Sequence, residues 1–253
     1  MRNLHAMTLE VQARRGRPFL LAARVPENLP GCHFDGLDVE KWAREQLVDL
    51  FALGCRSFEV DVAAFRRISA GTPIKLYCAL DDHHSTDGYC APPIEVLRGV
   101  FANWYRQGAD GVQTFNFKYA PDPGELHWDM HLQAYRELGD PARIRYLDKT
   151  FVVQRLDPVL VREYIVPRRV GGPGPAPHRT EPPARGLENQ LEVRLNNQLL
   201  QGVRVEEGWL VYPVQPLQLA VGENLVGVRV DSRPPAVGRE IRIEKLELQV
   251  RYS

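Results

Sequence analysis

The run ALDDHHSTDGY at residues 79–89 gathers the side chains best suited to chemistry. It places Asp81, Asp82, His83 and His84 next to one another. A carboxylate can act as a nucleophile, a general acid or a general base, and a histidine beside it can orient it or bind a ligand. We therefore predict that Asp81 and Asp82 are catalytic and that His83 and His84 bind a ligand. A plain solvated surface loop is the alternative.

The same residues and their cysteine neighbours are also candidates for a metal site. Cys78, Cys90 and the run at 82–84 supply ligand types that suit zinc. Their spacing matches no closed site, and none of the four cysteines of the chain forms a C-x-x-C pair. We therefore expect no metal, no cofactor and reduced thiols.

Three further side chains stand where a ligand could reach them. Arg24 ends an apolar run and could hold an anionic or hydroxyl-rich ligand, or form a salt bridge at a rim. Asn116 lies between two phenylalanines, and alternation in a regular strand turns Phe115 and Phe117 to one face and Asn116 to the other. Asn116 is then the predicted ligand contact, while Trp128, which opens a helix, could stack on a ligand or join the core.

The elements that must position these residues alternate along the first part of the chain. Apolar runs near 18–25, 47–53, 74–80 and 112–117 predict four buried strands. Amphipathic stretches lie between them, and Asp38 and Asp61 stand where they can cap two helices. Buried strands alternating with helices predict βαβ units and a parallel sheet.

The second part of the chain has a different pattern. Residues 167–186 hold six prolines and four glycines, which predicts a loop or linker. Beyond it, apolar residues alternate with polar ones at 191–195, 226–230 and 246–252, as in antiparallel strands. We predict an α/β part at 1–150 and an all-β part at 151–253 that forms a jelly-roll-like antiparallel β-sandwich.

Composition and charge exclude several classes of protein. The 32 basic residues balance 32 acidic ones, which argues against a nucleic-acid partner. No apolar run is long enough for a membrane span. The first residues lack the apolar core of a signal peptide, so as written the chain is expected in the cytoplasm.

The segment RGVFANWYRQGADGVQTFNF, residues 98–117, resembles the last βα segment of a glycoside-hydrolase-like (β/α)8-barrel family of uncharacterised bacterial proteins. The stretches at 20–26, 36–51 and 65–80 are similar to the three preceding strands of that family. EVRLNNQLL, GWLVYPV and GENLVGVRV resemble its C-terminal β-sandwich. The resemblance covers most of the chain.

The resemblance implies the second half of a TIM-type barrel, strands five to eight, because a complete barrel takes about 250 residues. In such enzymes the acid/base carboxylate follows strand four and the nucleophile follows strand seven, where Asp81 and Asp82 stand. We therefore expect a carbohydrate-active protein, related to enzymes that hydrolyse O-glycosidic bonds but incomplete as an enzyme. The alternative is a non-catalytic fragment that binds carbohydrate or protein. Self-association, or an N-terminal barrel half encoded elsewhere, would complete the barrel.

Overall fold

The computed structural model describes residues 1–54, 57–81, 92–115, 117, 128–153, 190–206, 209–231, 243 and 245–252. It divides the chain into two compact units. Unit 1 contains Met1–Pro175 and Glu244–Ser253, and unit 2 contains Ala176–Ile243. Unit 2 is therefore an insertion between two parts of unit 1. The sequence-based division at residue 150 stays a prediction.

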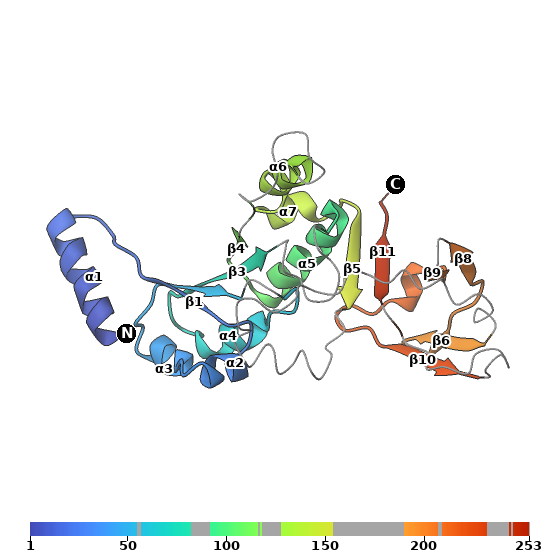
Figure 1. Ribbon diagram of the computed structural model, residues 1–253, viewed down its shortest axis with the longest axis horizontal. Helices are drawn as coiled ribbons and strands as arrows, with labels where there is room; N and C mark the ends of the chain where they lie inside the picture. The colour runs from blue at the N-terminus through green and yellow to red at the C-terminus, as the bar shows by residue number, and fades with distance from the viewer. Residues whose placement is uncertain are drawn as a thin grey trace, which may run out of the picture. The chain divides into compact units, whose positions relative to one another are not determined.

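Strands and helices alternate in the first part of unit 1 (Figure 1). They are α1 (Arg2–Arg15), β1 (Ala22–Val25), α2 (Leu29–Phe34), α3 (Val39–Arg44), β2 (Leu50–Leu53), α4 (Val62–Ile68), β3 (Lys75–Asp81), α5 (Ile94–Gln107), β4 (Gly111–Phe115), α6 (Trp128–Glu137) and α7 (Pro141–Ile144). Strands β1 to β4 form one parallel sheet in chain order. The prediction of a mixed α/β protein with a four-stranded parallel sheet is confirmed.

Local sequence signals explain where several helices begin. The Asp38 carboxylate accepts a hydrogen bond from the Lys41 amide at 3.1 Å, and Asp61 accepts one from the Ala64 amide at 2.9 Å. Both predicted caps are therefore confirmed. The sequence analysis missed α2, in which Asn28 caps a helix that has proline in its first turn.

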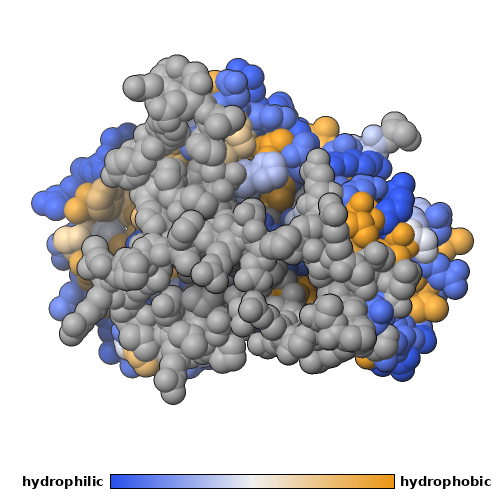
Figure 2. All heavy atoms as spheres, turned by 45° about the vertical axis from the view of Figure 1, so that its right-hand side comes forward, coloured by the Kyte–Doolittle hydropathy of each residue, from blue (hydrophilic) through white to orange (hydrophobic). Residues whose placement is uncertain are grey.

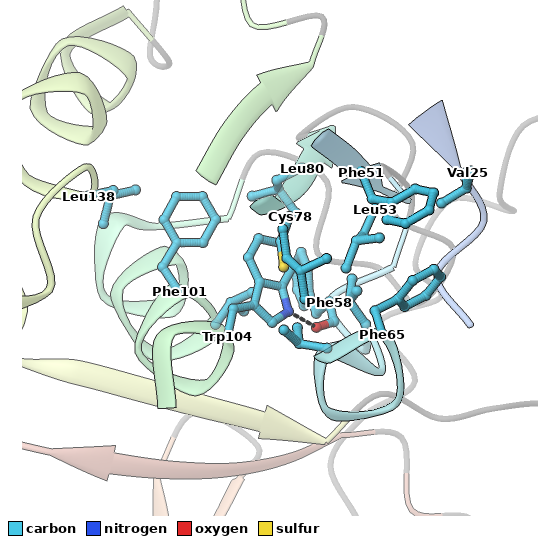
Figure 3. Packing of buried hydrophobic residues seen from close by; sticks show 14 of the residues in the cluster. Val25, Phe51, Leu53, Phe58, Phe65, Cys78, Leu80, Phe101, Trp104 and Leu138 are labelled. Atoms are coloured by element: carbon cyan, nitrogen blue, oxygen red, sulfur yellow. Dashed lines mark hydrogen bonds between the residues drawn. The ribbon is translucent and has the colours of Figure 1, made fainter. Parts of the chain in front are cut away.

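The core lies on one face of the parallel sheet. Side chains in register point to the same side, so Val25, Leu53 and Cys78 share this face. All three are at most 3% exposed and pack in one cluster with Phe101 and Trp104 of α5 (Figure 3). Helices thus cover this face of the sheet, and the opposite face carries the residues of interest below.

A two-stranded antiparallel sheet completes unit 1. It pairs β5 (Lys149–Val153) with β11 (Leu246–Val250), so the C-terminal segment belongs to unit 1. Helix α5 packs closely on β5 at Gly99, where a Cβ atom would overlap the Thr150 carbonyl oxygen. A side chain larger than hydrogen cannot fit between these two elements without moving one of them.

Unit 2 contains short antiparallel strands. They are β6 (Leu191–Leu195), β7 (Gln198–Leu199), β8 (Arg204–Glu206), β9 (Trp209–Val211) and β10 (Val226–Val230), with a 3₁₀ turn η2 (Pro216–Gln218). Asn196 and Asn197 both have positive φ and form the turn that joins β6 to β7. One face of the β10–β6 pair is polar and carries the Arg229–Glu192 ion pair.

Exposed apolar side chains also occur in unit 2. Leu217 and Val221 are 95% and 94% exposed, and Leu225 is 70% exposed. Figure 2 shows orange apolar atoms among blue polar ones on the face that it displays. The described residues of unit 2 form small antiparallel sheets, as the alternating pattern predicted; their assembly into a sandwich is taken up under Proposed function.

Candidate functional site

Three side chains of one sheet face lie where the parallel strands end. Arg24 is the penultimate residue of β1, and Asp81 and Phe115 are the last residues of β3 and β4. Asp81 of β3 lies beside Phe115 of β4. Arg24 of β1 lies in one row across the sheet with Ala52, Tyr77 and Gly111. Residues in register or an even number apart share a face. All three side chains therefore belong to the face opposite the core.

A contact across this face shows that the sheet is curved. The Arg24 guanidinium carbon lies 4.5 Å from the centre of the Phe115 ring, although β1 and β4 are the two outer strands. In a flat sheet, three strand spacings and four residues of offset would separate their Cα atoms by roughly 20 Å. The two side chains together cannot span that distance. Twist and curvature must therefore make this face concave.

Asp81 differs from the loop residue that the sequence suggested. It lies within β3 and is 0% exposed. A buried carboxylate is kept only where other groups bind it, and Asp81 does have an interaction partner. The structure therefore places this candidate in the sheet, at the edge of the concave face, and not on a solvated loop.

The other predicted site residues are not placed by the structure. Asp82, His83, His84 and Asn116 lie outside the described residues, and so does the side chain of Trp128, although its backbone begins α6. Their proposed ligand roles stay predictions. Of the predicted site residues, the structure places Arg24 and Asp81 on the same face.

The two phenylalanines that flank Asn116 do not share the face that strand alternation predicted. Strand β4 ends at Phe115, and Phe117 lies in a 3₁₀ turn beyond it. Phe117 is 2% exposed and stacks on His131 of α6, with ring centres 4.3 Å apart. Phe117 is therefore a core residue, because the strand stops before alternation can carry it to the concave face.

Glu27 is a polar residue near this edge that the sequence analysis missed. It lies two residues beyond β1 and is 9% exposed. Its side chain packs over Gly54, just beyond β2, where a Cβ atom would come 2.5 Å from the Glu27 Cγ atom. A glutamate within two residues of the carboxyl end of a parallel strand is the sequence signal that could have indicated a second carboxylate near the site.

The charged residues of the segment 98–117 have a structural role in this chain. Arg98 of α5 forms two hydrogen bonds to Glu137 of α6, at 2.8 and 3.1 Å, and one to the Asp148 carbonyl. Asp110 binds Arg66, Lys75 and the Leu76 amide. The Arg98 contacts join α5 to α6 and to the residue before β5, and the Asp110 contacts lie at the amino ends of β3 and β4, opposite to the carboxyl ends that carry Asp81 and Phe115. The segment thus builds the scaffold, and Phe115 is its described contribution to the site.

The Arg98–Glu137 pair makes a pH prediction. Burial raises the pKa of the Glu137 carboxyl, but hydrogen bonds from Arg98 and Gln133 and the charge of Arg98 lower that pKa by more, so it lies below the usual glutamate value. A lowered folded-state pKa contributes stability above the unfolded value of about 4.3, and that stability is lost as the pH falls through the folded-state pKa.

Acidification should therefore lower the stability of the native chain more than that of the Glu137→Gln variant. The native chain should unfold with a higher free energy than the variant at pH 6. We expect this advantage to be about 1 kcal/mol smaller at pH 3.5. Urea unfolding at both pH values measures it, with exposed Glu10→Gln as the control. A difference that is independent of pH would contradict the role of this pair.

The two described cysteines, Cys32 and Cys78, are neither metal ligands nor reactive thiols. No group of three or more His, Cys, Asp or Glu side chains suited to a metal occurs among the residues that the structure describes. Burial raises the pKa of the Cys78 thiol to about 12, and burial with the nearby Asp35 and Glu27 carboxylates raises that of Cys32 to about 12. Both stay protonated at neutral pH and are poor nucleophiles and ligands.

A second concave feature lies beside α5 and β5. This groove of about 450 Å³ is lined by Glu59, Asp61, Asn103, Gln107 and Val152, among others. Glu59 and Asp61 would be a tempting carboxylate pair, but Asp61 caps α4 as predicted. We therefore regard the carboxyl ends of the parallel strands as the better candidate site.

Comparison with known proteins does not identify this site. Neither a family model nor a curated protein matches the chain. In the described part of the chain, no helix combines the length and apolar character needed to cross a membrane. What the fold defines is a mixed α/β protein with a curved parallel sheet and polar groups at its carboxyl edge.

Proposed function

We propose that the chain is a carbohydrate-active, glycoside-hydrolase-like protein that binds a saccharide on the concave face of its parallel sheet. In this proposal β1 to β4 form half of a TIM-type barrel, and the strands of unit 2 belong to a β-sandwich. Four parallel strands with helices on one face and a concave other face are what half of such a barrel requires. The edge strands β1 and β4 would pair with further strands in a complete barrel.

The observation that carries the proposal is the position of Arg24, Asp81 and Phe115. Barrel enzymes build their sites at the carboxyl ends of their strands, on loops and on the last strand residues. Here a cation, a buried carboxylate and an aromatic ring meet that description on one concave face. Hydroxyl groups of a sugar can donate to a carboxylate and accept from a guanidinium.

Binding is the activity that we propose for these strands. Hydrolysis with retention needs two carboxyl groups about 5–5.5 Å apart. Asp81 stands where the resemblance puts the nucleophile, while the acid/base is expected after a barrel strand that precedes β1 in the family. The alternative function, a non-catalytic protein-binding fragment, predicts no saccharide affinity at all.

Saccharide binding can be tested by saturation-transfer NMR and calorimetry with neutral and acidic methyl glycosides. We expect millimolar or tighter binding, weakened at least tenfold in Asp81→Asn, because the substitution removes the negative charge and replaces one acceptor oxygen with an N–H donor. The exposed Asp35→Asn is the matched control and should bind as the native chain does. Because Asp81 is buried, Arg24→Ala at an exposed position provides a second variant, with the same expected loss.

Absence of binding by any saccharide would overturn the proposal. Unchanged affinity in both variants would also overturn it, since the saccharide would then bind elsewhere. Circular dichroism of each variant shows whether its fold is retained, which separates a lost contact from a lost structure.

A further inference from the structure

Strand β10 is an edge of the small sheet in unit 2 and is poorly covered. Among the described strands it pairs only with β6 (Figure 1). All of its residues except the first are exposed, and they include Val228 and Val230 at 38% and 39%, although these valines belong to the apolar face of the sheet. An unpaired side of a strand presents N–H and C=O groups to which another strand can bind.

The register with β6 shows which backbone groups of β10 point outward. The amide of Asp231, one residue beyond β10, donates a 2.8 Å hydrogen bond to the Gln190 carbonyl. Hydrogen-bonded and non-hydrogen-bonded pairs alternate along an antiparallel ladder, so the odd-numbered residues of β10 bond to β6. The N–H and C=O groups of Val226, Val228 and Val230 therefore point away from β6. In the described part of the chain, no residue bonds to these groups.

The charged side chain that could protect this edge is held away from it. Edge strands commonly avoid pairing with other chains by carrying proline, a bulge or a charged side chain. Residues 226–230 contain no proline, and their one charged side chain is that of Arg229. It donates to Glu192 of β6 at 2.9 Å and to Asp231 at 2.8 Å, on the polar face of the sheet. Its charge is neutralised there, and the outer side of β10 keeps no such protection.

We propose that β10 pairs with β10 of a second copy of the chain, antiparallel and about a two-fold axis at Val228. This register lets the outward N–H and C=O groups of all three valines bond to the other copy. It places Val228 opposite Val228 and Val226 opposite Val230, which are favourable apolar pairs. It also places Arg229 opposite Gly227, so like charges do not meet. The strand is thus complementary to itself, as a two-fold interface requires.

This interface is separate from the saccharide site proposed above. It lies in unit 2, and it does not depend on the proposed function or on completion of the parallel sheet of unit 1. The contact of one short strand with another buries less than about 1,200 Å², so we expect a reversible dimer with a dissociation constant in roughly the micromolar range.

Two substitutions at one position test this register. Nothing lies within 4 Å of a Cβ atom at Gly227, so a side chain can be accommodated there. Gly227→Lys puts a lysine opposite Arg229 of the other copy and should weaken the dimer at least tenfold. Gly227→Glu puts a carboxylate opposite the same arginine and should leave the dimer as tight as the native one, or tighter. Sedimentation equilibrium of the full chain, from about 5 µM to about 500 µM, measures all three constants.

Both variants lose the same glycine, so a difference between their dimer constants reports the charge across the interface. Circular dichroism shows whether each variant keeps its fold. A second measurement uses Val228→Cys, which should form a disulfide-linked dimer when oxidised with copper phenanthroline because the two cysteines meet at the axis. Leu199→Cys, 44% exposed on β7, is its control and should cross-link no more than the native chain does.

Three results would overturn the inference. A native chain that stays monomeric over the whole concentration range would do so, even if it bound a synthetic peptide of residues 225–231, because the edge would then accept a strand of another protein. Equal weakening by Gly227→Lys and Gly227→Glu would exclude this register. A dimer that Gly227→Lys leaves unchanged would have its interface elsewhere, for example at the edges of the parallel sheet of unit 1.

Discussion

Replacing Trp104 with alanine is expected to lower the free energy of unfolding of unit 1 by about 4 kcal/mol. Trp104 is 0% exposed and is one of the largest buried side chains of the described chain. Its ring stacks on Phe101 with centres 5.0 Å apart, and its Nε1–H donates a 2.9 Å hydrogen bond to the Phe58 carbonyl (Figure 3). The substitution removes this packing and also leaves a buried carbonyl without its donor.

Two further variants separate these contributions. Trp104→Phe keeps an aromatic ring and loses the hydrogen bond, so we expect a smaller cost of about 2 kcal/mol. Trp209→Ala removes a tryptophan that is 39% exposed in unit 2 and should leave unit 1 almost unchanged. Urea unfolding followed by far-ultraviolet circular dichroism measures all three. A cost below about 1 kcal/mol for Trp104→Ala would contradict the central position of this ring in the core.

The parallel sheet could be predicted from the sequence because each of its strands is a short apolar run that can be recognised without knowledge of its neighbours. The four apolar runs lie between helices whose caps are visible as Asp38 and Asp61, and the strands form at or near the predicted residues. The predicted strand starts at Pro18 and Leu47 were early, since β1 begins at Ala22 and β2 at Leu50. Local patterns indicate that an element exists more reliably than where it begins.

Contacts between residues far apart in the chain could not be predicted from the sequence. Nothing near Phe151 or Leu248 indicates that these residues face each other across β5 and β11, because the pairing joins segments far apart in the chain. The contact between Arg24 and Phe115 is of the same kind. Each residue was visible as a candidate, but their meeting depends on the curvature of the whole sheet.

At Gly99, helix propensity and tertiary packing predict opposite effects of an alanine substitution on stability. It lies inside α5, where helix propensity alone predicts that alanine would stabilise the protein by about 1 kcal/mol. The structure predicts the opposite, since a Cβ atom there would overlap the Thr150 carbonyl oxygen and lie 2.8 Å from the Thr150 carbonyl carbon. Both obstacles are backbone atoms, which cannot rotate aside as the end of a flexible side chain can.

We therefore expect Gly99→Ala to lower the free energy of unfolding of unit 1 by about 3 kcal/mol, because α5 and β5 must separate to admit the methyl group. Gly139→Ala is the matched control, since nothing lies within 4 Å of the Cβ position there and the substitution should change stability by less than about 0.5 kcal/mol. Urea unfolding of both variants gives the comparison. A neutral or stabilised Gly99→Ala would show that propensity dominates at this position, and that β5 is not held against α5 in solution. A clear loss would show that the glycine after Arg98 is required by the packing of α5 on β5, and not by the chemistry of the site.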